Sequence, residues 1–348
     1  MPWTKILAEN NKLIDTDIDG DKKAGREITY REALLEAQDQ LLANDSKVFV
    51  YGEGVDDAGS IFGSTKGLHE KYGIKRVFDT PLSESALTGV AVGAALAGMR
   101  PILVHMRMDF LLLTLDQIIN HAAIWHYSFS GQIKVPVIIR CIVGRGWGSG
   151  PQHSQSLEAL LYHVPGLRVY MPATPYDAKG LMMEAVKDGH PTIFIEHRWL
   201  YDKKGQVPEA PYSVEKGKGR VVVEGSDVTI VATSLMVHES ATAVKKLAEE
   251  GIKAELIDLR TIKPLDEDII LKSVAKTGKL VVTDYGWHTG GVASSISCMV
   301  SEKGFSSLRK PVKRVTCPDI PTPTAHNLEA AYYPSADDVA NAVRELCS

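Results

Sequence analysis

The sequence predicts an α/β fold with two domains, each built around a parallel sheet. Short apolar runs of strand length alternate with longer helical stretches along most of the chain. A stretch at 202–219 that mixes charge, proline and glycine without periodicity separates two such regions. The chain has 348 residues, more than one hydrophobic core usually serves. We therefore expect a mobile lead-in (1–27), a first domain (28–201), a linker (202–219) and a second domain (220–348).

Two helix starts in the first domain have clear capping residues. Thr29 immediately precedes a helical stretch, and Glu32 lies three residues after Thr29. This spacing is typical of a capping box. The second helix start has Thr174 as its cap, Pro175 at the first helical position and Asp177 in the first turn. The apolar stretch 110–127 has the length and periodicity of a partly buried helix. The predicted strands of this domain are 47–51, 100–106, 135–142, 167–172 and 191–197.

The second domain repeats the alternation without repeating the sequence. Its closing stretch, 336–347, has the pattern of an amphipathic helix. The prolines at 321 and 323 predict a turn before it. The other predicted helices are 239–251, 264–277 and 292–304, and the predicted strands are 227–233, 254–259, 279–286 and 313–317.

Composition excludes several classes of protein. Hydrophobic residues make up 44% and charged residues 24%, and the net charge of -4 argues against a nucleic-acid partner. Four cysteines without a C-x-x-C pair do not form a disulfide framework and fit a reducing compartment. We find no bilayer-spanning run and no export or transit pattern, so we expect no membrane association and a cytoplasmic protein.

One carboxylate stands where a strand meets a helix. In VFDTPLSESALTGVAVGAALAGM, which spans 77–99, Glu84 opens the helix after a short strand. Ligands of α/β proteins bind at the edge where strands end, so Glu84 is a candidate for chemistry. From this stretch alone capping is the favoured interpretation, because an acid in a first turn offsets the helix dipole.

Two loops complete the set of candidates. The glycine-rich stretch after the first strand has neither a Walker lysine nor G-x-G-x-x-G, so we interpret it as a loop at an active-site edge. A second glycine-rich loop carries His153 between Gln152 and Ser154. Loops at strand ends often carry function, although a single histidine is often only a hydrogen-bonded structural group.

Several motifs occur in an order that is specific to one family. They are GEGV, DTPLSESALTGVAVGAALAGMRP, DQIINHAA, SGQIKVPVIIR, QHSQSLEA, PGLRVYMPATPYDAKGL and LIDLRTIKPLD. Together they resemble the beta subunit of thiamine-diphosphate-dependent 2-oxoacid dehydrogenases, the first components of pyruvate, branched-chain 2-oxoacid and acetoin dehydrogenases. The resemblance covers nearly the whole chain and implies a pyrimidine-binding domain followed by a transketolase-like C-terminal domain.

The resemblance implies roles for three side chains. Glu84 matches the glutamate that hydrogen-bonds the aminopyrimidine of thiamine diphosphate and promotes its imino tautomer. His153 matches a histidine near the reacting carbon, which assists proton transfer or acyl transfer to lipoamide. Phe110 matches an aromatic residue that packs on the pyrimidine ring, although a buried core phenylalanine is an alternative interpretation. The implied activity is that of an oxidoreductase acting on 2-oxo groups with lipoamide as acceptor.

The resemblance also implies partners. The sequence has no G-D-G followed some thirty residues later by Asn, the pattern that holds magnesium and the cofactor diphosphate in this enzyme class. An alpha subunit is therefore expected to hold Mg²⁺ in an alpha2-beta2 heterotetramer, with a lipoyl acyltransferase core as a further partner. The family binds a potassium ion through backbone oxygens, at a segment that Ala185, Val186 and Asp188 match.

Some residues depart from the family pattern and leave the substrate open. Arg107 could pair with a second carboxylate on the substrate or form an ion pair with Asp109 or Asp116. Arg145 and Trp147 replace small residues near the histidine and could narrow the pocket or contact the alpha subunit. Acetoin dehydrogenase and a non-catalytic interaction subunit remain alternatives to a 2-oxoacid dehydrogenase.

Overall fold

The computed structural model describes residues 25–57, 59–146 and 148–348. The predicted lead-in thus lies almost entirely outside the described residues, and so does Trp147. The described chain divides into two compact units. The N-terminal unit comprises residues 25–144 and 160–216, and the C-terminal unit comprises residues 145–159 and 217–348.

A parallel sheet forms the centre of the N-terminal unit. Within this unit the strands lie in the order β6-β7-β5-β4-β2-β3, and every neighbouring pair is parallel. These strands are β2 (Val48–Gly52), β3 (Val77–Asp79), β4 (Arg100–His105), β5 (Ile138–Val143), β6 (Arg168–Tyr170) and β7 (Thr192–His197). Most of their residues are buried, as expected for a sheet with helices on its faces.

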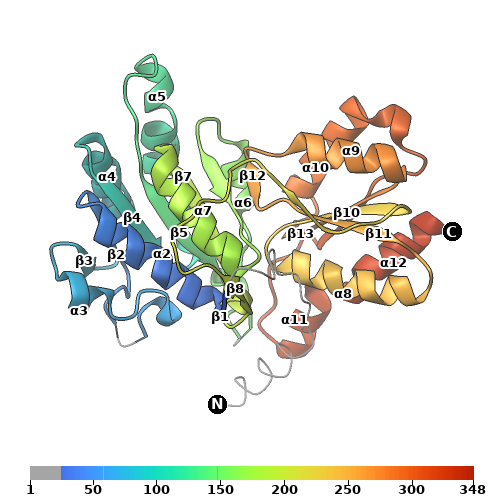
Figure 1. The fold of residues 1–348 in the computed structure, drawn as a ribbon, viewed down its shortest axis with the longest axis horizontal. Helices are drawn as coiled ribbons and strands as arrows, with labels where there is room; N and C mark the ends of the chain where they lie inside the picture. The colour runs from blue at the N-terminus through green and yellow to red at the C-terminus, as the bar shows by residue number, and fades with distance from the viewer. Residues whose placement is uncertain (1–24, 58, 147) are drawn as a thin grey trace. The chain divides into compact units, whose positions relative to one another are not determined.

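Two helices of this unit begin where the sequence predicts. Thr29 caps α2 (Tyr30–Asn44) in a capping box with Glu32, and Thr174 caps α7 (Pro175–Asp188) by accepting a hydrogen bond from the Asp177 amide. Both predicted starts are confirmed, and α2 and α7 pack side by side (Figure 1). The remaining helices are α3 (Leu68–Tyr72), α4 (Glu84–Leu96) and α5 (Trp125–Ser128), with short turns η1 (Ile61–Gly63) and η5 (Arg198–Leu200). Helix α6 (Glu158–His163) begins in the C-terminal unit and ends in this one.

The predicted continuous helix at 110–127 is wrong. The chain instead forms a 3-10 segment η2 (Met108–Thr114), a π-helical segment η3 (Gln117–Ala123) and the short α5. The Thr114 hydroxyl donates to the carbonyl of Leu111, three residues back, which favours the tighter turn over a continuing α-helix.

Part of the predicted linker belongs to a small sheet. Strand β8 (Lys204–Val207) pairs antiparallel with β1 (Arg26–Thr29). Just beyond it, the buried Nζ of Lys179 donates to the carbonyl oxygens of Pro208 at 2.7 Å and Glu209 at 2.9 Å. The chain therefore stays attached to the N-terminal unit after residue 202, and the sequence-based domain boundaries stay a prediction.

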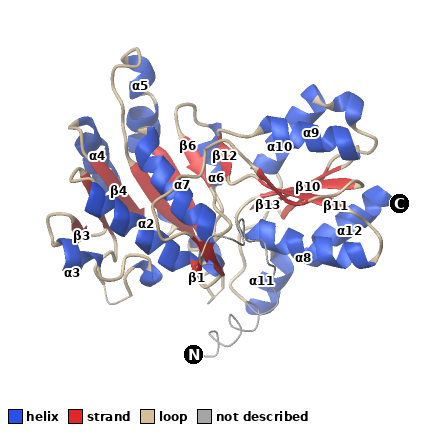
Figure 2. Cartoon of the chain, in the orientation of Figure 1, coloured by secondary structure: helices blue, strands red, loops and turns tan. Residues whose placement is uncertain are grey.

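The C-terminal unit contains a five-stranded sheet in the order β14-β13-β10-β11-β9. All neighbours are parallel except β9, which pairs antiparallel with β11. Figures 1 and 2 show α9 and α10 on one face of this sheet and α8 and α12 on the other. The elements are β9 (Arg220–Val223), β10 (Val228–Ala232), β11 (Ala254–Asp258), β12 (Thr261–Lys263), β13 (Leu280–Trp287), β14 (Lys313–Cys317), α8 (Leu235–Glu249), α9 (Glu267–Thr277), α10 (Val292–Lys303), α11 (His326–Tyr332) and α12 (Ala336–Cys347), with η4 (Gly150–Gln152) and η6 (Phe305–Ser307).

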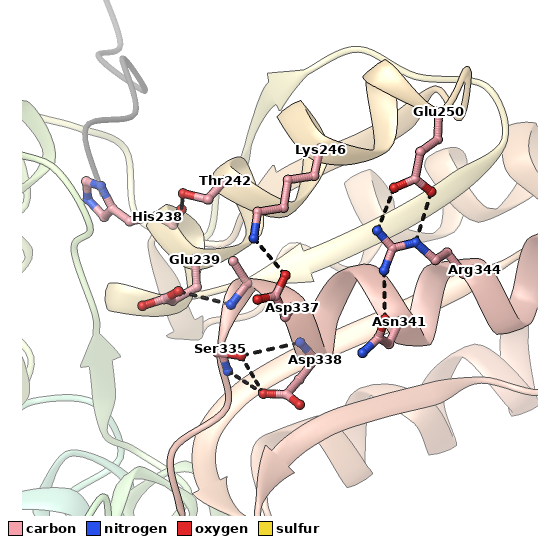
Figure 3. A network of polar contacts seen from close by, with 11 residues as sticks. His238, Glu239, Thr242, Lys246, Glu250, Ser335, Asp337, Asp338, Asn341 and Arg344 are labelled. Atoms are coloured by element: carbon pink, nitrogen blue, oxygen red, sulfur yellow. Dashed lines mark hydrogen bonds and ion pairs between the residues drawn. The ribbon is translucent and has the colours of Figure 1, made fainter. Parts of the chain in front are cut away.

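Polar contacts hold α8 and α12 together at the surface (Figure 3). Lys246 on α8 bonds Asp337 on α12 at 2.7 Å, and Arg344 on α12 bonds Glu250 at the end of α8. Ser335 and Asp338 form a capping box at the start of α12. Because these groups are exposed, each pair adds little to stability.

A buried polar network lies at the centre of the N-terminal unit. Arg140 on β5 is fully buried and bonds the Glu196 carboxylate on β7 at 2.6 and 2.8 Å. Its Nη1 donates to Gln38 on α2 at 2.9 Å, and its Nη2 also donates to the Ser64 hydroxyl at 2.8 Å. The Tyr201 hydroxyl donates to Glu196. Groups from three separate segments thus accept hydrogen bonds from the buried guanidinium of Arg140.

Neither disulfides nor membrane spans occur among the described residues. All four cysteines are free thiols, with Cys141 and Cys317 buried and Cys298 exposed. No helix in the described part of the chain is long and apolar enough to cross a bilayer.

Breaking the buried pair should strongly destabilise the chain. We expect Arg140→Met to lower the free energy of unfolding by about 3–5 kcal/mol, because Glu196 would remain buried without its cation. Lys246→Ala, which breaks an exposed pair, should cost less than about 1 kcal/mol. Urea unfolding followed by circular dichroism measures both variants. Equal effects of the two substitutions would contradict the assigned role of the buried pair.

Candidate active site

The carboxyl edge of the N-terminal sheet brings together two of the predicted site residues. Strand β3 leads directly to Glu84, the first residue of α4, and β4 leads through Arg107 into η2, which contains Phe110. Because β3 and β4 both pair parallel with β2, their carboxyl ends lie at the same edge of the sheet. The predicted position of Glu84 at a strand-to-helix junction is confirmed.

The surroundings of Glu84 suit either of its predicted roles. Its side chain is half-buried in the first turn of α4, where a carboxylate faces the positive end of the helix dipole. Ser83, the residue before the helix, makes no side-chain capping bond. The Glu84 carbonyl accepts a hydrogen bond from the Thr88 hydroxyl at 2.8 Å. Its catalytic role therefore stays a prediction.

Glu53 is a second carboxylate at this edge, which sequence reasoning did not single out. It directly follows β2, is only 5% exposed, and its Oε1 has no hydrogen-bond partner among the described residues. Burial and the nearby carboxylates of Glu84 and Asp79 raise the pKa of Glu53 to about 7. The edge thus holds an acid that exchanges its proton near neutral pH. The sequence does contain a signal that could have identified Glu53, because this acid is flanked by two glycines at the end of a predicted strand.

Close backbone contact fixes the position of Glu53. Gly52 has a φ of 142°, and a Cβ there would lie 2.2 Å from the Val104 carbonyl oxygen on β4. The Glu53 amide donates to the same oxygen at 3.3 Å, and the Gly54 amide donates to Asp79 at 2.6 Å. Only glycine at position 52 allows this approach.

Arg107 stacks on an aromatic ring. Its guanidinium carbon lies 5.1 Å from the ring centre of Phe62, and Arg198 approaches the same ring at 4.5 Å. Burial lowers the pKa of Arg107, and the Asp109 carboxylate raises it. Of the two predicted ion-pair partners, Asp116 accepts hydrogen bonds from Asn120 and Gln117. Two cationic side chains therefore lie at the same edge as Phe110.

His153 belongs to the C-terminal unit. It ends the short turn η4 and is half-buried, and its amide lies 3.4 Å from the Gly150 carbonyl oxygen. Glu84 and Phe110 belong to the other unit. The structure therefore brings Glu84 and Phe110 to one sheet edge, and it places His153 on a loop that is packed within a different unit.

Arg145 anchors the start of this loop inside the chain. Its Nη1 donates to the Tyr285 hydroxyl at 2.8 Å, and its guanidinium lies 4.2 Å from the ring centre of Tyr333. The next amide, of Gly146, donates to the Glu329 carboxylate at 2.6 Å. These contacts within the C-terminal unit hold Arg145 in place; a role in narrowing the pocket or contacting a partner stays a prediction.

The predicted potassium residues lie in the last turn of α7, where Ala185 and Val186 are buried. The Asp188 carboxylate already pairs with Lys216 at 2.6 Å and with Arg168 at 3.0 Å. Burial raises its pKa, but hydrogen bonds from these cations hold the pKa below its usual range. The Asp188 carbonyl lies 3.2 Å from Nδ1 of His190. Cations of the chain thus pair with the Asp188 side chain, whereas the predicted ligands are backbone oxygens, and the potassium site stays a prediction.

Comparison with known proteins identifies the class. The chain matches the family model of the transketolase pyrimidine-binding domain over residues 26–204 and that of the transketolase C-terminal domain over residues 217–339. A solved structure described as a split-gene transketolase in an inactive beta4 tetramer superposes with a TM-score of 0.74 at 25% identity, covering 92% of this chain and 98% of that one. The chain is therefore an α/β protein with two transketolase-type domains.

Curated relatives define the family more closely. The beta subunit of acetoin:2,6-dichlorophenolindophenol oxidoreductase of Cupriavidus necator is 44% identical over 92% of this chain and 97% of its own length. The beta subunit of the pyruvate dehydrogenase E1 component of Rickettsia felis is 43% identical over 92% and 98%, and that of 2-oxoisovalerate dehydrogenase of Bacillus subtilis is 40% identical over 92% and 98%. The chain belongs to this family of 2-oxoacid and acetoin dehydrogenase beta subunits, which confirms the resemblance.

The close approach of β2 and β4 can be tested with two glycines. Gly52→Ala should destabilise the chain by about 3 kcal/mol or more, because its Cβ would overlap the Val104 carbonyl and its φ is unfavourable. Gly93→Ala in α4 meets no atom within 4 Å and should stabilise the helix by about 0.5–1 kcal/mol. Thermal unfolding compares the two variants. A Gly52→Ala protein as stable as the wild type would contradict the close approach.

Proposed function

We propose that this chain is the beta subunit of a thiamine-diphosphate-dependent 2-oxoacid dehydrogenase. With an alpha subunit it would catalyse the oxidative decarboxylation of a 2-oxoacid and transfer the acyl group to lipoamide. The observation that carries the proposal is the carboxyl edge of a pyrimidine-binding domain, where Glu84 opens α4 beside the buried acid Glu53.

The residues at this edge suit the recognition of an aminopyrimidine. When bound, thiamine diphosphate would supply the carbon nucleophile that attacks a 2-oxo group. The Glu84 carboxylate would hold a proton at a ring nitrogen and so favour the imino tautomer, which an amide in its place would not do. Phe110 would pack against the ring. His153 would donate or accept a proton near the reacting carbon, since imidazole does both near neutral pH.

The proposed active unit includes a second chain. The sequence has no G-D-G and Asn pattern for Mg²⁺ and the cofactor diphosphate, so an alpha subunit would hold both. The relatives are named as beta subunits, and the similar solved structure is described as an inactive tetramer of beta chains. An alpha2-beta2 heterotetramer that docks on a lipoyl acyltransferase core is the assembly that we propose.

The substrate is proposed only as a class. Relatives named for acetoin, pyruvate and 2-oxoisovalerate share 44%, 43% and 40% identity with this chain, which does not separate them. Acetoin is therefore retained as the second candidate, because the first of these relatives is named for it. Arg107 and Arg198 at the sheet edge add 2-oxoacids with a second carboxylate to the substrates worth testing.

Glu84→Gln should separate catalysis from helix capping. We expect the heterotetramer with this variant to assemble normally, because the amide keeps the shape of the carboxylate. Its oxidative activity, followed with an artificial electron acceptor, should fall about 10²- to 10⁴-fold, because the group that holds the pyrimidine proton is lost. Acetoin and a panel of 2-oxoacids would serve as substrates.

The matched control is Glu70→Gln. Glu70 is also an acid in the first turn of a helix of this unit, α3, but it is exposed. Its replacement should leave activity unchanged. If both variants kept full activity, or if the beta chain alone were active, the proposed function would be wrong.

His153→Asn should affect acyl transfer more than decarboxylation. We expect reductive acylation of lipoamide to fall about 100-fold or more, because a proton donor and acceptor is removed near the reacting carbon. Activity with the artificial acceptor should fall less. Equal losses in the two assays would show that His153 does not act selectively in acyl transfer.

A further inference from the structure

Two buried carboxyl groups, one of them five positions after His153, lie close together in the C-terminal unit. Glu158, the first residue of α6, is fully buried, and Asp284 on β13 is 4% exposed. A Cβ on Gly286 would lie 2.7 Å from Oε1 of Glu158 and 3.2 Å from Oδ2 of Asp284. Both oxygens therefore lie close to the same small space, which a side chain at position 286 would fill. All three residues belong to the C-terminal unit.

The remaining oxygens of both groups have ordinary donors. Oε2 of Glu158 accepts from the Ser156 hydroxyl at 2.6 Å, and Oδ1 of Asp284 accepts from the Gly286 amide at 3.2 Å. Oε1 of Glu158 and Oδ2 of Asp284 have no donor among the described residues. An ionised carboxylate can only accept hydrogen bonds. One proton held between the two oxygens satisfies both groups at once.

The groups around this pair are neutral side chains, an engaged guanidinium and backbone amides. Burial raises the pKa of Cys317 and of Tyr285, so both stay neutral near pH 7. The guanidinium of Arg145 is engaged by Tyr285 and Tyr333. Burial and the Asp284 carboxylate raise the pKa of Glu158. Burial also raises the pKa of Asp284, although backbone amides of Gly286, Ala293 and Tyr285 oppose this shift.

We propose that Glu158 and Asp284 share one proton and that this hydrogen bond holds the His153 loop against strand β13. Glu158 is then a positioning residue. It stands five positions after His153, while Arg145 and Gly146 fix the other end of the same loop on Tyr333 and Glu329. The catalytic part of this inference depends on the proposed function of His153; the shared proton does not.

Loss of the shared proton should loosen the loop at alkaline pH. Two buried carboxylates without a proton repel each other across the Gly286 space. Burial and the neighbouring carboxylate hold the pKa of Glu158 in the folded chain above its ordinary value of 4.5. Between the ordinary and the raised pKa the folded state binds more protons than the unfolded state, so stability falls as the pH rises through this range.

The experiment compares Glu158→Gln and Glu158→Ala with wild type. The glutamine keeps a neutral donor to Asp284, and the alanine removes it. Glu302→Gln on the exposed side of α10 is the matched control. For the purified chains, thermal unfolding between pH 5 and pH 9 should show a steep alkaline decline in wild type and the control, and a shallower one in Glu158→Gln. Glu53 also titrates between pH 5 and pH 9 in every one of these proteins. The test is therefore the difference between each variant and wild type in the pH dependence of the unfolding temperature.

Assembled heterotetramers give the second readout. Acyl transfer by Glu158→Gln should match wild type at pH 7 and extend to higher pH, whereas Glu158→Ala should lose activity about tenfold or more. Wild type and Glu158→Gln with the same pH dependence of unfolding would overturn the shared proton. An altered unfolding profile with unchanged acyl transfer in Glu158→Ala would overturn the positioning role. A complex without any 2-oxoacid or acetoin activity would refute the proposed function instead, and the unfolding comparison would still decide the shared proton.

Discussion

The fully buried Arg140 joins the segments that carry the candidate site in the N-terminal unit. Its guanidinium connects strands β5 and β7 with helix α2 and with Ser64, near the end of the glycine-rich loop after β2. That loop begins at Glu53, where the contact of Gly52 with β4 fixes it. Both ends of the loop are therefore fixed by the core, and Glu53 is held at the edge beside Glu84. Without a compensated charge in the core, this arrangement would cost several kcal/mol.

The protein compensates buried charge in two different ways. Arg140 and Lys179 are surrounded by carboxylates, carbonyls and an amide, so their charges are matched by fixed groups of the chain. Glu53 and Glu158 instead face other carboxylates, and their pKa values rise until a proton becomes the counter-charge. In the structural core, fixed groups of the chain compensate the buried charges. Compensation by a proton occurs at Glu53, which lies near Glu84, and at Glu158, which is five positions after His153 in the chain.

Local patterns in the sequence were enough to predict most of the helices and strands. The caps at Thr29 and Thr174 and the closing helix α12 follow from neighbouring residues, and the structure has them as predicted. The irregular segment η2–η3 was missed because its apolar pattern does not distinguish 3-10, α and π turns. The edge strand β9 and the linker strand β8 depend on partners far along the chain. Glu158 and Asp284 were missed for the same reason: only the folded chain brings them together.

The loop that carries His153 lies early in the chain but packs with residues that come last. Gly146 bonds Glu329, and Arg145 stacks on Tyr333. During synthesis from the N-terminus, these contacts are impossible until residue 333 has left the ribosome, whereas Arg140 and Glu196 can meet much earlier. The order of synthesis thus separates the completion of the two units. The edge with Glu84 can form while the chain is still growing, and the His153 loop acquires its anchors only when the chain is nearly complete.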